Sequence, residues 1–180
     1  MNRHHENELS ATLAAHVRST DAVPEDANNR AQIKLTARMQ QARRPARAPA
    51  RAWWAVTATA VLAIAAGGFS FEARFEQAAA PETVAAFRRM LPLESKIIHV
   101  RWSGEGGWIP MGDLDVGIGP ENATRYPSPG ELIFYPGGVS ETELLLAYGY
   151  VAFASKAGAL AGNHFATITS GNENLRELGR

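Results

Sequence analysis

Apolar and polar residues alternate along much of the chain after residue 68, and this period of two predicts β-strands. The clearest case is Phe69–Phe75, where Phe71 and Phe75 share one face with Ala73. A strand also follows at 96–102, where the pattern puts Ile97, His99 and Arg101 together on one face. Predicted strands of this kind cover residues 69–75, 96–102, 108–111, 131–135, 142–147, 151–154 and 164–169.

Residues 81–91 follow a helical period instead. Pro81 suits the first helical position, because the N–H that it lacks would have no partner there. Val84, Phe87 and Leu91 form a stripe that predicts a buried face, and Pro92 stops the helix.

Many short strands and one good helix favour a mainly β domain, a closed or nearly closed small barrel. The glycine-rich stretch Gly104–Gly107 is predicted to turn the chain between two of the strands. The polar connection 112–130 is longer than usual, which marks it as a functional loop or lid. We therefore predict that residues 68–180 form the barrel domain.

Residues 1–51 are predicted to be a polar tail that is partly helical or disordered. Leu9, Leu13 and Val17 have helical spacing, and a second helical stretch is expected around Ile33, Leu35 and Met39. Large apolar residues are too few here for an independent core.

Residues 52–67 form an apolar, Ala-rich stretch that predicts a single membrane helix. About 20 apolar residues are needed to cross the bilayer, and the uncharged run 52–71 just reaches that length. Basic residues before it would leave the N-terminus in the cytoplasm, with the protein in the inner membrane. A buried helix in a cytoplasmic protein is the alternative. The overlap with the strand predicted at 69–75 shortens the span, so a fusion or a misassigned start upstream of the domain is a further alternative.

Charge and cysteine content exclude several classes of function. Residues 1–51 hold nine Arg and Lys against five Asp and Glu, whereas residues 67–180 hold nine against thirteen. The second part lacks the basic balance that nucleic-acid binding requires. The chain has no cysteine, which excludes disulfides and thiolate nucleophiles.

A series of phrases in fixed order resembles a known family over about residues 69–180. The phrases are Ile98–Gly104, Trp108–Pro110, Gly112–Asp115, Pro120–Asn122, Tyr135–Gly138, Ser140–Glu143, Phe153–Lys156 and Leu160–Phe165. They resemble a bacterial cyclophilin-like family of unknown function, domain-of-unknown-function family 3830, which implies a small cyclophilin-like β-barrel. Similarity to the cyclophilin prolyl isomerases is weaker. Pro81-Glu-Thr83 matches their helix, but His99-Val-Arg101 has one residue more than the isomerase motif.

The predicted site centres on the His99 and Arg101 face. Arg presents a planar fork to a carboxylate, and aromatic residues supply apolar walls. Structural roles are the alternative: Arg101 paired with Glu141 or Glu143, and His99 hydrogen-bonded inside the barrel. The predicted ligand-binding residues are His99, Arg101, Trp108, Asn122, Tyr135, Glu141 and His164.

We predict a module that binds a small anionic or amphipathic ligand or a peptide. It has no nucleic-acid partner, its membrane contact would run through 52–67, and a homo-oligomer is left open. The alternatives are a prolyl isomerase and a small-molecule hydrolase using Ser103 or Ser140. His99, His164, Glu121 and Glu141 lack tight ligand spacing, so we predict neither a metal nor a cofactor.

Overall fold

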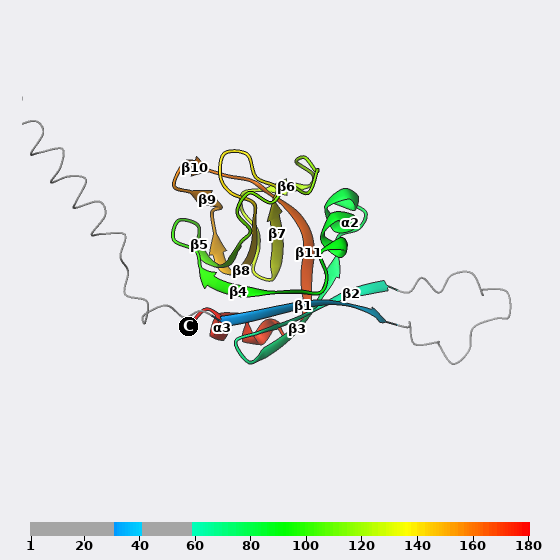
Figure 1. Ribbon diagram of the computed structural model, residues 1–180. Helices are drawn as coiled ribbons and strands as arrows, with labels where there is room; N and C mark the ends of the chain where they lie inside the picture. Colours follow the sequence, from blue (N-terminus) through cyan, green and yellow to red (C-terminus); the bar gives the residue numbers. More distant parts are fainter. Residues whose placement is uncertain (1–30, 41–58) are drawn as a thin grey trace, which may run out of the picture.

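The computed structural model describes residues 31–40 and 59–180, and most of the strands in these ranges lie in one antiparallel sheet (Figure 1). The strands are β1 (Ala31–Gln40), β2 (Thr59–Ala66), β3 (Phe69–Phe75), β4 (Leu93–His99), β5 (Gly104–Pro110), β6 (Ala123–Thr124), β7 (Glu131–Tyr135), β8 (Glu143–Val151), β9 (Ala154–Ser155), β10 (Gly158–Ala159) and β11 (Gly162–Ser170). The helices are α2 (Pro81–Arg89), α3 (Leu175–Leu178) and the 3₁₀ turn η2 (Asn172–Asn174).

Eight of these strands close into a barrel. Their order is β3-β2-β1-β4-β5-β8-β7-β11, and β11 pairs with β3 to complete the circle. The short β6 pairs with the first two residues of β11, and β9 and β10 form a separate small hairpin. Closure leaves these eight strands without a free edge that could pair with another chain.

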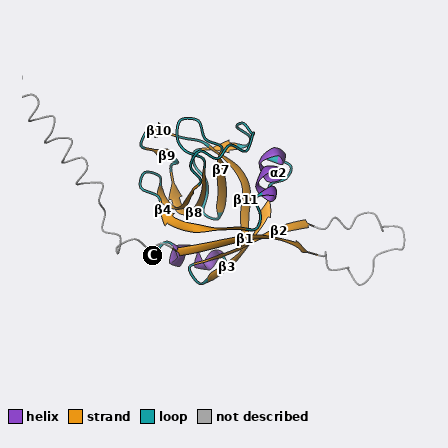
Figure 2. Cartoon of the chain, in the orientation of Figure 1, coloured by secondary structure: helices purple, strands orange, loops and turns teal. Residues whose placement is uncertain are grey.

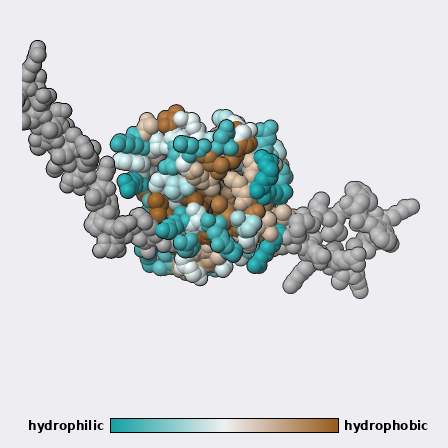
Figure 3. Space-filling view, in the orientation of Figure 1, coloured by the Kyte–Doolittle hydropathy of each residue, from teal (hydrophilic) through white to brown (hydrophobic). Residues whose placement is uncertain are grey.

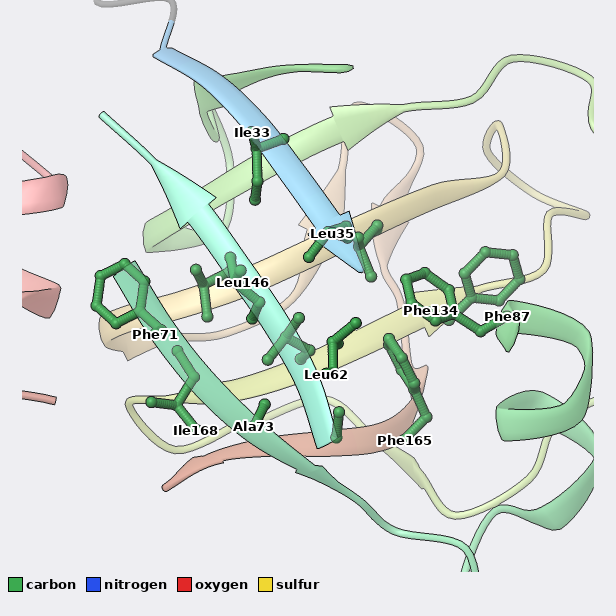
Figure 4. Close-up of a cluster of buried hydrophobic side chains, with 14 of the residues drawn as sticks. Ile33, Leu35, Leu62, Phe71, Ala73, Phe87, Phe134, Leu146, Phe165 and Ile168 are labelled. Carbon is green, nitrogen blue, oxygen red and sulfur yellow. The ribbon is translucent and has the colours of Figure 1, made fainter. Parts of the chain in front are cut away.

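The barrel interior holds the main core. On β3, Phe71, Ala73 and Phe75 are buried while the residues between them are not, as the alternation predicts. Figure 4 shows side chains from β1 and β2 meeting Leu146 of β8 and Phe165 of β11 in one cluster. Phe71 and Phe165 are at most 2% exposed, which is typical of a close-packed interior.

The helix expected around Ile33, Leu35 and Met39 is wrong, because these residues belong to strand β1. Buried and exposed residues alternate here: Ile33 and Leu35 are buried in the main core, whereas Gln32 and Lys34 are exposed. β1 lies between β2 and β4 and pairs with each of them. The rest of the tail predicted at 1–51 lies outside the described residues.

The membrane helix predicted at 52–67 is also corrected. Residues Thr59–Ala66 form β2, which pairs with β1 on one side and β3 on the other. Leu62, Ile64 and Ala66 face the core, so the described part of the apolar run packs inside the barrel. Residues 52–58 lie outside the described residues. Among the helices in the described ranges, none is both long and apolar enough to cross a membrane.

The helix predicted at Pro81 is confirmed as α2, which runs beside β11 (Figures 1 and 2). Val84 and Phe87 are buried, and Phe87 packs against Phe165 with ring centroids 4.5 Å apart. The helix ends at Arg89, whose neighbour Arg88 places its guanidinium 4.7 Å from the Phe75 ring centroid. Both contacts fix the helix on the barrel wall.

A second apolar cluster covers the outer face of β7 and β8. Leu144 and Leu146 face the main core, whereas Leu145 and Ala147 point the other way, against Phe153 and Leu160. β8 is therefore buried on both faces, which explains its continuous apolar run. The segment from 152 to 161 acts as the cover.

The strand expected at 96–102 ends three residues early. β4 covers Leu93–His99, and residues 101–103 form a bend. The glycines predicted to make the turn lie inside β5, which starts at Gly104. At Gly107 a Cβ atom would lie 2.5 Å from Ile97 Cδ1, so a larger residue there would force the Ile97 side chain to move.

Candidate functional site

A clamp joins the bend after β4 to the cover over the second cluster. Ser103 Oγ donates to the carbonyl oxygen of Ala154 (2.9 Å), and the Ala154 N–H donates back to Ser103 Oγ (3.1 Å). The Ala152 N–H donates to the Ser103 carbonyl (2.8 Å). The bend is closed by Gly104, which has φ +101° and would place a Cβ 2.5 Å from the Tyr150 carbonyl oxygen. The clamp holds Arg101 and Lys156 on facing segments.

Between these segments lies a cavity of about 300 Å³, here called the Arg101 pocket. β5 and β8 contribute Trp108 and Glu143, and the chain before β8 contributes Ser140 and Glu141. The full lining is Val100, Arg101, Trp102, Ser103, Trp108, Ser140, Glu141, Glu143, Ala154, Ser155 and Lys156. The pocket therefore lies on the outer face of the barrel, beside the second cluster.

Glu143 is the most buried charged side chain of this pocket. It is 7% exposed, and its carboxyl makes no hydrogen bond or ion pair within the described ranges. Burial, and then the charge of Glu141, raise the pKa of Glu143 to about 7. At neutral pH this carboxyl is thus divided between its protonated and ionised forms.

Arg101 and Lys156 contribute two cations to the same pocket. Both are exposed, and neither forms an ion pair within the part of the chain that the structure describes. The alternative prediction, in which Arg101 forms an ion pair with Glu141 or Glu143, is therefore wrong. Trp108 also lines the pocket, and its buried Nε1 has no hydrogen-bond partner within the described ranges.

A second, more open cavity of about 650 Å³ adjoins the first, here called the Asp113 pocket. Ser140 and Glu141 line both cavities, and Glu141 accepts a hydrogen bond from the Gly112 N–H (3.2 Å). Tyr135 lines only the Asp113 pocket, where its hydroxyl accepts from the Val139 N–H (3.1 Å). The long loop 112–130 and the 136–142 loop form the walls.

Exposed apolar side chains gather at these two cavities. The face seen in Figure 3 mixes apolar patches with hydrophilic side chains. The large exposed apolar residues in the described ranges are Trp102, Leu114, Tyr126, Val139 and Tyr150. Trp102 lines the Arg101 pocket, whereas Leu114 and Val139 line the Asp113 pocket. The combined cleft therefore has both charged and apolar walls.

His99 does not join Arg101. Because β4 ends at His99, the strand geometry that would put every second side chain on one face does not reach Arg101. Arg101 therefore lines the pocket, whereas His99 does not. His99 Nδ1 is 2.8 Å from the Tyr148 hydroxyl. Burial, and then the nearby Glu105, raise the pKa of Tyr148, so its phenol stays protonated. His99 thus makes a hydrogen bond of the kind that the structural alternative expects, and it is not part of the Arg101 pocket lining.

Asn122 and His164 lie together but line neither pocket. Asn122 adopts φ 47° and donates from Nδ2 to the His164 carbonyl (2.8 Å). The Thr167 hydroxyl donates to Glu76 (2.7 Å), so His164 Nε2 donates to Thr167 Oγ1 (2.9 Å). Burial would raise the pKa of Glu76, but the hydrogen bonds from Thr167 and Arg74 lower it overall.

Glu121 from the long loop caps the start of α2. Its carboxylate accepts from the Glu82 N–H (3.1 Å), the Thr83 N–H (2.8 Å) and the Thr83 hydroxyl (2.8 Å). Burial would raise the pKa of Glu121, but these hydrogen bonds lower it. Asn163 donates from Nδ2 to Thr83 and to the Gly119 carbonyl, and accepts from the Glu121 N–H. The matching Pro81-Glu-Thr83 phrase thus has a structural role.

The structure unites three of the predicted residues, Arg101, Trp108 and Glu141, in one pocket. It adds Glu143 and Lys156, which the sequence prediction did not include. A charged residue inside the apolar run 142–147 was the available signal for Glu143. Within the described ranges no set of His, Asp and Glu is placed to hold a metal ion.

The phrases that carry the family resemblance converge on this site. Residues 98–104, 108–110, 140–143 and 153–156 each supply lining of the Arg101 pocket. The sequence profile of the family described as Protein of unknown function (DUF3830) matches residues 62–180. The chain belongs to this family. β1 lies outside the matched residues, although it completes the barrel of this DUF3830 member. No curated protein matches the chain.

Proposed function

We propose that this DUF3830 domain is a binding module that holds a small amphipathic ligand with an anionic group in the Arg101 pocket. The observation that carries the proposal is that Arg101 and Lys156 line one pocket with Trp102 and Trp108, and that neither cation forms an ion pair with another described residue. An anionic group would meet the cations, and an apolar body would cover the indole rings.

The adjoining Asp113 pocket supports a longer occupant as well. Because Ser140 and Glu141 line both cavities, a ligand in the first can extend across them into the second. Leu114 and Val139 offer apolar contacts there. The longer ligand that fits this arrangement best is a peptide with a free C-terminal carboxylate.

The cyclophilin-like arrangement expected from the resemblance remains part of this proposal, supported by the closed antiparallel barrel and by the helix that follows β3. The enzyme alternatives have less support. A prolyl isomerase would use a His and Arg pair, but His99 bonds to Tyr148 away from Arg101. A hydrolase that uses Ser103 would need this side chain as a free nucleophile, but Ser103 Oγ bonds twice to Ala154, which leaves Ser140 as the remaining serine of that alternative.

The proposal is tested by thermal unfolding with hexanoate, benzoate and a short peptide with a free C-terminus. Ligand at about 100 times its Kd stabilises by about 2.7 kcal/mol, which raises the Tm by roughly 5–10 °C. The double variant Arg101→Ala/Lys156→Ala should lose this rise, whereas Arg89→Ala, an exposed cation on α2, should keep it. If no ligand raises the Tm of the unaltered protein, or if both variants respond like it, the proposal fails.

A further inference from the structure

Charges in the Arg101 pocket are arranged by depth. Glu143 is 7% exposed and forms the floor, whereas Arg101 and Lys156 are exposed and form the rim. Glu141 is half-buried, and its one hydrogen bond within the described ranges comes from the Gly112 N–H. The floor thus carries carboxyl groups and the rim carries cations, with no ion pair between them in the described ranges.

Neither a simple anion nor a simple cation can pair with both the carboxyl groups at the floor and the cations at the rim. An anion alone would meet the rim, but it would leave the buried Glu143 carboxyl without a partner, and a buried charge without a partner is costly. A cation alone would meet Glu143 but would lie close to the two rim cations. A ligand with a positive group directed inward and a negative group directed outward matches the depth order.

The side wall also suits a positive group. Trp108 is part of the pocket lining, and tryptophan is the aromatic side chain that attracts cations best. Trp108 lies opposite Leu145 on β8, two residues from Glu143 on the same face of that strand. The indole and the carboxyl therefore border the same inner region.

We propose that the ligand of this pocket is a small zwitterion of the amino-acid type, with its ammonium group toward Glu143 and its carboxylate between Arg101 and Lys156. This inference rests on the proposed function of the same pocket and specifies the ligand's chemistry. A cavity of about 300 Å³ is at the small end of ligand pockets, which suits a single amino acid or a short amino-carboxylic acid.

Binding is coupled to a proton on Glu143. Its neighbours are Tyr135 opposite it on β7, Pro110 opposite it on β5, Glu141, and the two rim cations. An ammonium ion favours the ionised carboxylate, so the protonated fraction of Glu143 must release its proton when the ligand binds. Since the pKa of Glu143 in the empty pocket is about 7, affinity falls as the pH drops below that value.

The experiment is isothermal titration calorimetry on the full chain with three matched series of probes. The zwitterions are glycine, β-alanine, 4-aminobutyrate and 6-aminohexanoate; the carboxylates and the primary amines have the same chain lengths. One zwitterion length should bind at least about tenfold more tightly than its matched carboxylate or amine, the contribution of one charge-assisted hydrogen bond. The optimal length reports the spacing between floor and rim.

The proton provides a second readout. Affinity for the best zwitterion should be about tenfold weaker at pH 6 than at pH 8. Titration in buffers of different ionisation enthalpy should show proton release near pH 7, and this measurement needs no variant. Glu143→Gln should lose both the preference for the zwitterion and the proton release. Asp113→Asn, which removes a carboxylate from the adjoining pocket, should keep both.

The outcomes separate the two proposals. If carboxylates bind as tightly as zwitterions, with no proton release and no change in Glu143→Gln, the zwitterion inference is overturned while the binding module stands. The zwitterion inference is likewise overturned, and the binding module stands, if Asp113→Asn abolishes the preference for the zwitterion as fully as Glu143→Gln does. If no series binds at any length, both proposals fail.

Discussion

The carboxyl group of Glu143 determines how the candidate site responds to pH. It lies opposite Pro110 and Tyr135 in the sheet, with the Glu141 charge nearby. Its pKa of about 7 lies above the ordinary value of 4.5, because burial and a like charge both disfavour ionisation. Between these two values the folded protein binds more protons than the unfolded chain, so folding stability decreases as the pH rises.

Glu143→Gln should remove this pH dependence. Near pH 4.5 the variant and the unaltered protein should be about equally stable, because both side chains are neutral. The variant should gain relative stability as the pH rises from 4.5 to 7, by on the order of 3 kcal/mol, and the difference should become constant above pH 7. Urea unfolding at several pH values measures it. A difference that does not change with pH would contradict the assigned pKa.

At the scale of elements, α2 depends on a loop that is distant in sequence. Its own N-cap residue, Ala80, has no side-chain hydrogen bond, and Glu121 supplies the acceptor instead. An anion at this end also complements the helix dipole. The long loop is therefore part of the framework, and it reaches the pocket walls from the same anchored position.

Glu121→Ala should destabilise the protein by about 1–2 kcal/mol, the usual cost of losing an N-terminal cap. Because hydrogen bonds lower the pKa of Glu121, its contribution is present above the ordinary pKa of 4.5 and is lost as the pH falls through the lower folded value. Glu94→Ala, which removes an exposed carboxylate paired with Lys34, is the control and should cost less than 1 kcal/mol. Equal losses in the two variants, measured by urea unfolding, would count against the cap.

On the scale of the whole molecule, the barrel closes only with a strand from outside the family match. β1 lies between β2 and β4, and no pairing joins those two strands directly. Leu35 is fully buried in the main core, together with Leu62 of β2. Residues Ala31–Gln40 should therefore unfold together with the rest of the barrel.

Leu35→Ala should lower the free energy of unfolding by about 2–5 kcal/mol, because it leaves a cavity in a close-packed core. Lys34→Ala, on the exposed side of the same strand, should change it by less than 1 kcal/mol. Urea denaturation followed by tryptophan fluorescence gives both values. Two variants of equal stability would place β1 outside the cooperative barrel.

The sequence alone determined the elements whose patterns have a single interpretation. The alternation in Phe69–Phe75, the Pro81 start of α2 and the strand Glu131–Tyr135 follow local rules of period and backbone geometry, and all three are confirmed. Arg101, Trp108 and Glu141 could be selected because their side chains suit ligand binding wherever they are brought together.

Tertiary structure decided the rest. The Ala-rich run in β2 suits a helix or a strand equally, and only its pairing with β1 and β3 makes it a strand. Local alternation could not show that β4 stops at His99, because the Ser103 clamp to Ala154, about 50 residues away, diverts the chain there. The same long-range contact brings Arg101 and Lys156 over Glu143. The charged residues of this pocket come from segments that are far apart in the sequence, so a local pattern of apolar and polar residues could not predict that they meet.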